Sequence, residues 1–292
     1  LGAKISRFNR VTDLVQRADK SWDVVTEKGT VHAEIIVNAA GYMAQEIAHM
    51  MKPHGTDFKR HIPMATMEHQ YLLTEAIPEL EAKGDERMPL VRDPDISYYL
   101  RQEKHGLILG PYEWHAKSRW TKRNDPQPDD FAFQLWDEDL DRLEYYIEDA
   151  MARMPILATG GVSRVINGPI PYAPDGNPLI GPCPGVQNAF EACVFTFGIT
   201  QSGGAGKILA EWITEGETDW DCWAVDPRRF TSFAGDVYSE AKAIEIYSHE
   251  YAQHFPHEER TAGRPVRTSP VYAALKAKGA KFGARAGWER AV

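Results

Sequence analysis

The stretch Gly198-Ile199-Thr200-Gln201-Ser202-Gly203-Gly204-Ala205-Gly206-Lys207 is glycine-rich and sits between two predicted elements. It follows an apolar run over 189–197 that predicts a strand, and it leads into a predicted helix that ends at Thr214. Strand, small-residue turn and helix in this order are typical of an α/β fold in which a ligand approaches the backbone. The second half of the chain therefore predicts such a fold.

The chemistry of this turn follows from its place before a helix. The N-terminus of a helix carries free N–H groups and about half a positive charge, so the turn can hold a phosphate or the electron-rich C2 carbonyl edge of a flavin. It is not a P-loop, because Ile208 replaces the Ser/Thr and Gln201 stands at the first Gly, and Leu209 breaks a dinucleotide fingerprint. The alternative is that the glycines serve only close packing of helix on strand.

A second strand, turn and helix occur near the start of the chain. The run 34–38 predicts a buried strand, Asn38-Ala39-Ala40-Gly41 a small-residue turn, and 43–51 a short helix. Small residues at the carboxyl end of a strand let a cofactor lie against the backbone. A plain tight turn into a helix is the alternative. Short alternating runs over 4–6, 22–25 and 31–33, with Lys28-Gly29 as a turn, predict an antiparallel meander before it.

From His61 onward the chain predicts an antiparallel sheet. Strands are expected over 61–74 and 97–103, the latter paired with 107–112 across the turn 104–106. Apolar residues at helical spacing predict an amphipathic helix over 137–154, which Pro155 stops, and a further helix over 237–251. The fold class is thus α/β with mixed α+β character.

Ionisable residues of this sheet form the candidate site. His69 lies in the first strand, and Tyr98, Tyr99, Tyr112 and Glu113 flank the predicted hairpin. A histidine can accept a proton or present a neutral imidazole to an amine, and aromatic rings attract methylated ammonium groups. The alternative is that they are hydrogen-bonded structural residues of strands. Alternation along the strand puts Tyr98 and Tyr99 on opposite faces, so at most one lines a given pocket.

Composition excludes several classes of protein. The 292 residues are 43% hydrophobic and 26% charged, which is typical of a globular chain, and the net charge of -9 disfavours nucleic acid or an anionic membrane surface as partner. No apolar run approaches the roughly 20 residues of a membrane span. Three cysteines without C-x-x-C spacing disfavour a disulfide framework and a zinc site, and neither His54 and His61 nor His249, His254 and His257 have metal-ligand spacing.

Several short motifs along the chain are specific when they occur together in one order. The chain resembles the flavin-dependent amine dehydrogenase and oxidase family that includes dimethylglycine and sarcosine dehydrogenases. The resemblance covers nearly the whole sequence and rests on these segments: Arg10-Val11-Thr12-Asp13, Val37-Asn38-Ala39-Ala40-Gly41, Glu68-His69-Gln70-Tyr71, Ser97-Tyr98-Tyr99-Leu100-Arg101-Gln102-Glu103, Gly110-Pro111-Tyr112-Glu113, Asn167-Gly168-Pro169, Pro174-Asp175-Gly176, the stretch 198–207, and Gly287-Trp288-Glu289-Arg290.

The resemblance implies FAD as cofactor and assigns residues to it. Val11 would approach the adenine, the turn after the first buried strand would lie near the diphosphate, and the glycine-rich turn would run beside the flavin ring. The cofactor-binding residues are then Val11, Asn38, Ala39, Ala40, Gly41, Gly198, Ile199, Thr200, Gln201, Ser202, Gly203 and Gly204. His69 and Tyr99 resemble the catalytic pair of the substrate pocket, and Tyr98, Tyr112, Glu113 and Thr200 are assigned to substrate binding; related oxidases carry a lysine near Thr200.

The resemblance also implies the domain organisation. An incomplete Rossmann-like FAD-binding domain would comprise residues 1–52 and 166–253, an interleaved antiparallel-sheet substrate domain 53–165, and an extended linker 254–292. The family's opening G-x-G-x-x-G turn and its C-terminal folate-binding domain do not occur here, and the chain begins at Leu1. We therefore expect a piece of a longer protein with an incomplete FAD site that binds FAD weakly by itself, tetrahydrofolate belonging to the folate-binding domain alone.

The implied activity is FAD-dependent oxidation of an N-methylated amino acid, dimethylglycine or sarcosine. Hydride would pass to flavin N5, and the resulting iminium would yield formaldehyde or methylene-tetrahydrofolate. The partners expected are this small amine and an electron acceptor, either a flavoprotein or oxygen, in the bacterial cytoplasm or, alternatively, the mitochondrial matrix. The alternatives are oxidation of another secondary or tertiary amine, and a non-catalytic module that keeps the fold.

Overall fold

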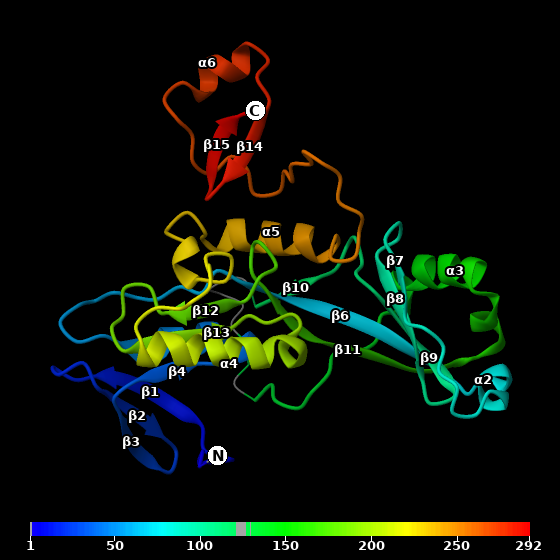
Figure 1. Cartoon of the computed structure of the whole chain (residues 1–292), viewed down its shortest axis with the longest axis horizontal. Coiled ribbons are helices and arrows are strands. Elements are labelled where there is room, and N and C mark those ends of the chain that lie inside the picture. Colours follow the sequence, from blue (N-terminus) through cyan, green and yellow to red (C-terminus); the bar gives the residue numbers. More distant parts are fainter. Residues whose placement is uncertain (1, 121–126, 129) are drawn as a thin grey trace. The chain divides into compact units, whose positions relative to one another are not determined.

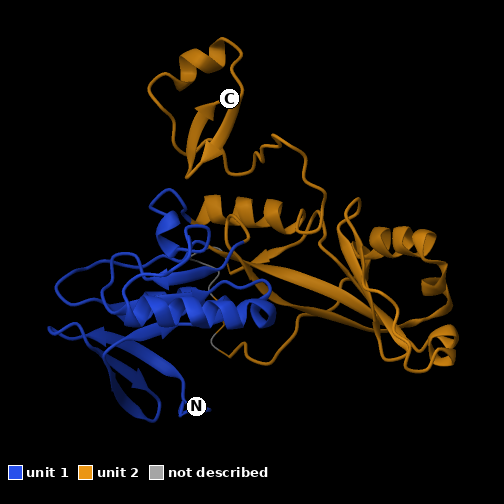
Figure 2. Cartoon of the chain, viewed as in Figure 1, with its two compact units in different colours: residues 1–63, 177–235 blue, residues 64–176, 236–292 orange. Residues whose placement is uncertain are grey.

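The computed structural model describes residues 2–120, 127–128 and 130–292. The chain divides into two compact units, each made of two separate segments: unit 1 contains residues 1–63 and 177–235, and unit 2 contains residues 64–176 and 236–292 (Figure 2). The sequence placed these boundaries after residues 52, 165 and 253 instead. The helix that follows residue 235 belongs to unit 2 because Ala243 and Tyr247 pack into the core of that unit.

Unit 1 begins with the expected meander. Strands β1 (Val11–Gln16), β2 (Trp22–Thr26) and β3 (Gly29–Ala33) are antiparallel, and β5 (Met51–Lys52) pairs in parallel with β1 (Figure 1). Residues 4–6, where a strand was expected, have no regular structure. Trp22 is fully buried, and its indole N–H donates to the carbonyl of Asn188 at 3.0 Å. This residue fixes the meander onto the second segment of unit 1.

A second sheet in unit 1 carries the two predicted turns. Its strand order is β12 (Leu179–Pro182), β13 (Ala189–Cys193) and β4 (Ile36–Asn38), with β13 parallel to β4. The 3-10 helix η1 (Gly41–Met43) and helix α1 (Ala44–Met50) follow β4, and helix α4 (Gly198–Thr214) follows β13; a short 3-10 helix η4 (Pro227–Arg229) completes the unit. Two strand-to-helix passages therefore share one sheet.

Unit 2 is built on a six-stranded sheet. The strands run in the order β10 (Ser118–Arg119), β6 (Ala65–Thr74), β9 (Gly106–Pro111), β8 (Tyr98–Glu103) and β7 (Val91–Asp93), and β11 (Val162–Tyr172) pairs antiparallel with β6 (Figure 1). The β8–β9 hairpin has the expected register, with Glu103 opposite Gly106. The sequence did not predict β11, whose Pro169 and Pro171 are uncommon in strands.

Each face of this sheet has its own core. One contains Tyr98, Leu100, Leu107 and Leu109 and is covered by α3 (Glu144–Arg153), with α2 (Pro78–Ala82) and the 3-10 helices η2 (Leu140–Arg142) and η3 (Pro155–Thr159) beside it. The other contains Met67, Tyr112, Tyr172 and Tyr247 and includes α5 (Asp236–Tyr247). Helix α3 ends before Pro155 as predicted. The helix expected over 237–251 ends at Tyr247; its Val237 is 82% exposed, whereas Ala243 and Tyr247 are buried and Ile244 packs partly buried against the same core.

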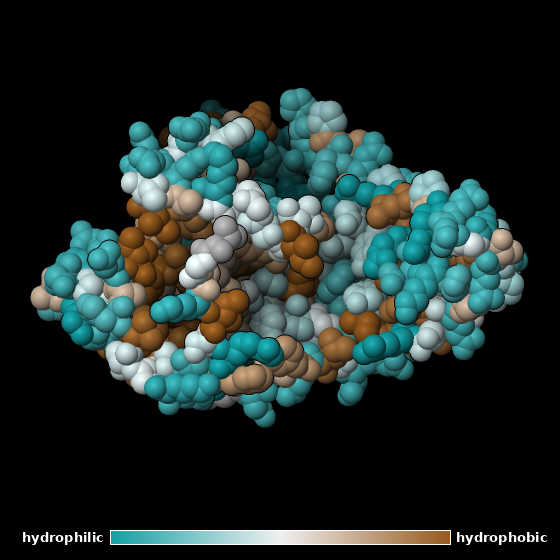
Figure 3. Space-filling view, turned by 60° about the horizontal axis from the view of Figure 1, so that its bottom comes forward, coloured by the Kyte–Doolittle hydropathy of each residue, from teal (hydrophilic) through white to brown (hydrophobic). Residues whose placement is uncertain are grey.

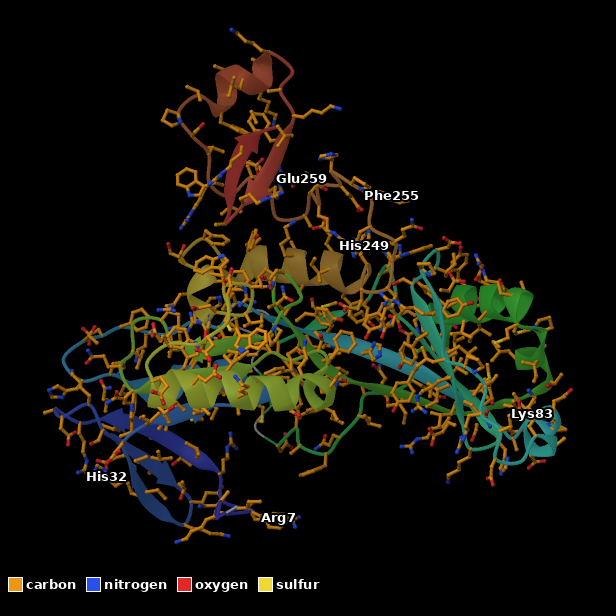
Figure 4. The ribbon with its side chains drawn as sticks, in the orientation of Figure 1. Arg7, His32, Lys83, His249, Phe255 and Glu259 are labelled. Atoms are coloured by element: carbon orange, nitrogen blue, oxygen red, sulfur yellow. The ribbon has the colours of Figure 1, made fainter. Side chains whose placement is uncertain are left out.

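The last part of unit 2 differs from the expected extended linker. Helix α6 (Tyr272–Ala277) is followed by a hairpin of β14 (Phe282–Arg285) and β15 (Trp288–Ala291). The Arg264 guanidinium binds both carboxylate oxygens of Glu289, at 2.9 and 2.7 Å. This ion pair ties the preceding segment to the hairpin. Figure 4 shows Glu259 in the chain that leads from α5 to this hairpin.

Large hydrophobic side chains are also exposed in both units. They include Ile199, Trp220 and Trp223 in unit 1 and Phe255 in unit 2, and Figure 3 shows hydrophobic side chains grouped among hydrophilic ones on one face of the molecule. Apolar atoms make up over half of an ordinary protein surface, so their exposure by itself identifies no site. In the described residues, no helix is both long enough and apolar enough to span a bilayer.

Candidate functional site

The two turns singled out in the sequence lie at one edge of one sheet. In the parallel pairing of β13 with β4, Glu191 is opposite Asn38, so both strands end at the same edge. Asn38 is followed by Ala39-Ala40-Gly41, and β13 is followed by the passage into α4. The carboxyl edge of parallel strands is where open α/β sheets bind ligands. The structure thus brings together, within unit 1, the two segments predicted to bind a cofactor.

Asn38 shapes the first of these turns. Its side chain is 2% exposed, its Nδ2 donates to the carbonyl of Ala44 at 2.9 Å, and its Oδ1 accepts from the N–H of Ala40 at 3.3 Å. Gly41 has a φ of +58°, a conformation that side chains beyond glycine seldom adopt. The turn is therefore held from inside by Asn38, while Ala39 and Ala40 leave its backbone free of bulky side chains.

The glycine-rich stretch is the start of α4 and not a loop before it. The helix begins at Gly198, and no described side chain caps its N-terminus. Gly198, Ile199, Thr200, Ser202, Gly203 and Gly204 are all exposed, and a Cβ atom added at Gly203 or Gly204 would meet no described atom within 4 Å. Glycine inside a helix costs about 1 kcal/mol relative to alanine. Packing within the described residues therefore does not explain these two glycines.

Gln201 supplies an unused acceptor at the same place. Its side-chain Oε1 is buried and has no hydrogen-bond partner among the described residues. The helix N-terminus offers N–H donors and a positive end, and Gln201 offers a carbonyl oxygen. A flat group that carries both hydrogen-bond acceptors and an N–H donor would pair with the N–H groups of the helix and with the carbonyl oxygen of Gln201.

Beneath this edge lies a buried ion pair. Arg60 donates to both oxygens of Glu191, at 2.6 and 2.9 Å, and the two side chains are 7% and 0% exposed. Burial alone would lower the pKa of Arg60, but the hydrogen bonds and charge of Glu191 raise it above its ordinary value. The carboxylate of Glu191 is thus fully engaged by protein, and it anchors the segment that precedes β6 to the carboxyl end of β13.

In unit 2 the structure collects aromatic side chains around His69. The imidazole ring centre lies 4.8 Å from that of Tyr112 and 5.8 Å from that of Tyr247, and Nδ1 lies 2.9 Å from the Tyr247 hydroxyl oxygen. Tyr99 is 6.5 Å from Tyr112, measured between ring centres. His69, Tyr99 and Tyr112, which the sequence assigned to one site, therefore belong to a single cluster.

Burial keeps this cluster uncharged. Burial lowers the pKa of His69 to about 4, and it raises the pKa of Tyr99 to about 12. The pKa values of Tyr112 and Tyr247 are also raised, in both cases chiefly by burial. At neutral pH the cluster presents a neutral imidazole and protonated phenols.

Three members of the cluster were missed by sequence reasoning. Tyr247 ends α5, Tyr251 follows it, and Tyr172 ends β11; the ring of Tyr251 lies 4.9 Å from that of Tyr112, and that of Tyr172 lies 5.4 Å from that of Tyr247. The spacing of Tyr247 and Tyr251, four residues apart in the stretch 237–251 that the sequence predicts as a helix, was an available signal. For Tyr172 no local signal exists, because its position depends on the pairing of β11 with β6.

Two residues assigned to substrate binding lie elsewhere. Tyr98 is 2% exposed and packs in the core on the opposite side of the sheet from Tyr99, because side chains alternate along β8. The Glu113 carboxylate is held by Arg142 at 2.7 Å and by Gln70 at 3.3 Å. Tyr98 is thus a core residue and Glu113 a member of an ion-pair network.

The remaining assigned residues keep their places in unit 1. Val11 opens β1 and is half-buried against the core that contains Leu14, and Thr200 is exposed in the first turn of α4. No group of three His, Cys, Asp or Glu residues among those described is arranged to hold a metal ion. Of the histidines considered as ligands, His249 lies just beyond α5 (Figure 4), where its Nδ1 is 2.7 Å from the Glu245 carbonyl oxygen.

Comparisons with known proteins place these features in a family. Residues 1–212 match the family model described as FAD dependent oxidoreductase, and residues 215–269 match a second model, described as FAD dependent oxidoreductase central domain. The chain is 42% identical to mitochondrial dimethylglycine dehydrogenase from Mus musculus, over 99% of the chain and 33% of the relative, and 34% identical to mitochondrial sarcosine dehydrogenase from Mus musculus, over 99% and 30%. It spans about a third of the length of these relatives.

A solved structure supports the same assignment. The L-proline dehydrogenase from P. horikoshii superposes with a TM-score of 0.60 and 26% identity, over 78% of this chain and 55% of that chain. The family model covers well over half of the 292 residues. The chain belongs to the FAD dependent oxidoreductase family.

Proposed function

We propose that the protein oxidises an N-methylated glycine derivative, dimethylglycine or sarcosine, with FAD as cofactor. The observation that carries this proposal is the cluster of uncharged aromatic side chains around His69, which suits a methylated amine in its neutral form. The two mouse relatives are named for dehydrogenation of these two amines. The substrate is then a small molecule, and the electrons leave to an acceptor that is a flavoprotein or oxygen.

The residues present at the edge of the β4 sheet fit FAD. The exposed first turns of α4, with the open Cβ positions of Gly203 and Gly204 and the unpartnered Oε1 of Gln201, suit a flat ring that carries carbonyls and an N–H. The turn Asn38–Gly41 would hold the diphosphate, and Val11 would approach the adenine. When bound, FAD supplies the acceptor for hydride, at its N5 atom. The positive N-terminus of α4 would favour negative charge that develops there.

The uncharged surroundings of His69 would keep the substrate amine neutral. An ammonium nitrogen has no lone pair to assist departure of hydride from an N-methyl carbon, so the amine must be neutral. With a pKa of about 4, His69 is neutral at physiological pH, and a buried, uncharged surrounding disfavours the ammonium form. Tyr99, half-buried in the same cluster, would orient the amine. The product is an iminium, which yields formaldehyde on hydrolysis or methylene-tetrahydrofolate by transfer.

Flavin reduction in a single turnover tests the proposal. The protein from the complete reading frame, mixed anaerobically with dimethylglycine, sarcosine or proline, should lose its absorbance near 450 nm fastest with one of the first two. His69→Gln should slow this step, and Tyr98→Phe, which alters only a hydroxyl in the opposite core, is the matched control. Unchanged reduction in His69→Gln would remove His69 from the mechanism.

The other outcomes separate the alternatives. Fastest reduction by proline would indicate another secondary amine as substrate. Absence of absorbance near 450 nm would indicate a module without flavin. The mitochondrial location named for both mouse relatives supports the matrix as the compartment, with the bacterial cytoplasm as the alternative.

A further inference from the structure

The hydrogen bond between His69 and Tyr247 joins two elements far apart in the sequence. His69 lies on β6 and Tyr247 ends α5, 178 residues later, and the 2.9 Å contact joins Nδ1 to the hydroxyl oxygen. Tyr247 is fully buried, whereas His69 is only partly buried. Within the described part of the chain, this contact is the one hydrogen bond made by the Tyr247 hydroxyl, and Nε2 of His69 has no partner there.

The direction of this hydrogen bond follows from what each atom can do. A tyrosine hydroxyl has one proton to donate, and a neutral imidazole has one N–H and one acceptor nitrogen. If Nδ1–H donated, the buried Tyr247 proton would have no acceptor among the described residues, and a buried unsatisfied donor is costly. If the hydroxyl donates to Nδ1, both groups are satisfied. The single proton of the imidazole then resides on Nε2.

We propose that Tyr247 is a positioning residue that donates to Nδ1 and holds His69 in the tautomer with its proton on Nε2. His69 therefore meets a substrate as a hydrogen-bond donor and not as a proton acceptor. This inference rests on the proposed function for its substrate, an N-methyl amino acid. The group that accepts from Nε2–H is then the substrate carboxylate, because a bond to the amine would occupy the lone pair that the reaction needs.

The groups around His69 support a neutral imidazole. The rings that face it are Tyr71 from β6, Tyr112 after β9 and Tyr247 from α5, all phenols. The carboxylates of Glu68 and Glu113 are bound by Arg142 on the other face of β6. Glu250, just beyond α5, is an acidic residue that contacts the cluster: its carboxylate accepts a hydrogen bond from the Tyr172 hydroxyl at 3.1 Å. Burial is what lowers the pKa of His69.

The tautomer can be measured directly by NMR. Long-range 1H–15N correlation spectra of the 292-residue chain with 15N-labelled histidine report which ring nitrogen carries the proton, and the His69→Gln variant identifies the His69 signals. We expect the Nε2–H tautomer near neutral pH. In Tyr247→Phe, which keeps the ring and removes the hydroxyl, we expect a mixture of tautomers and a rise in the His69 pKa of roughly half a unit to one unit.

Tyr172→Phe is the matched control. It removes a hydroxyl from the same cluster, but that hydroxyl binds Glu250 and not His69, so the His69 signals should stay as in the unaltered chain. An Nδ1–H tautomer in the unaltered chain would overturn the inference, and this measurement stands even if Tyr247→Phe fails to fold. A folded Tyr247→Phe with unchanged tautomer and pKa would overturn it as well. Because neither flavin nor substrate is present, failure of the proposed function would leave these results unaffected.

Discussion

Arg142 and Glu68 form an ion pair on the face of β6 opposite His69, with Nη1 of Arg142 2.6 Å from Oε2 of Glu68. The same guanidinium binds Glu113 at 2.7 Å, so one cation joins two carboxylates that are each 2% exposed. Burial alone would raise the pKa of Glu68, but the hydrogen bonds from Arg142 and Arg119 lower it. Glu68 precedes His69 and Glu113 follows Tyr112, so this network fixes the backbone beneath the aromatic cluster.

Removing Arg142 should therefore destabilise the protein strongly. In Arg142→Met the carboxylates of Glu68 and Glu113 are left buried without their shared cation, and breaking such a buried pair costs about 3–5 kcal/mol. Urea-induced unfolding followed by circular dichroism measures this cost. The control is Arg101→Met, which breaks the exposed pair with Glu103 and should cost under about 1 kcal/mol. Equal midpoints for the two variants would contradict the network's role.

The stability of the protein should depend on pH through His69. Its pKa falls from 6.5 to about 4 on folding, so between these values the unfolded chain binds more protons than the folded one. The stability held above pH 6.5 is then lost as the pH falls toward 4, by at most about 3 kcal/mol. Unfolding free energies of the unaltered chain and His69→Gln, compared across this range, should converge at low pH. Parallel curves would show that His69 does not titrate in this way.

Replacing the exposed glycines of α4 with alanine should raise the stability of the chain but weaken the binding of flavin. Gly203→Ala and Gly204→Ala place a Cβ where no described atom lies within 4 Å, so each should stabilise the chain by about 0.5–1 kcal/mol. If FAD lies against these positions, the same changes should weaken flavin binding by the protein from the complete reading frame, measured by fluorescence titration. Thr214→Ala, at the other end of the helix, should leave flavin binding unchanged. Stabilised variants with unaltered flavin affinity would place the flavin elsewhere.

The buried pair of Arg60 and Glu191 allows the stability cost of an unpaired buried charge to be measured. Arg60→Met leaves the fully buried Glu191 without its cation and should cost about 3–5 kcal/mol. In the double variant Arg60→Met/Glu191→Met no charge remains, so most of that stability should return. Chemical denaturation of the single and double variants measures the coupling. A double variant no more stable than Arg60→Met would contradict this explanation, because removing the unpaired carboxylate would then restore no stability.

Local patterns in the sequence predicted much of the fold because strand and helix periods are properties of short segments. The β2–β3 and β8–β9 hairpins and α3 form where alternation, turn residues and helical spacing indicated them. Alternation also separated Tyr98 from Tyr99 correctly. The strand β11 was not predicted, because its pairing with β6 outweighs the local preference of its prolines.

The sequence by itself determined that two small-residue turns follow strands and that histidine and tyrosine side chains recur on an antiparallel sheet, since these features lie within single segments. Only the tertiary structure decided which side chains meet. It brought the Tyr247 hydroxyl within hydrogen-bonding distance of His69, which lies 178 residues earlier in the chain, and it paired Glu113 with Arg142. The reason is that a side chain's neighbours depend on strand register and helix packing, which join residues distant in the chain and leave no trace in local periodicity.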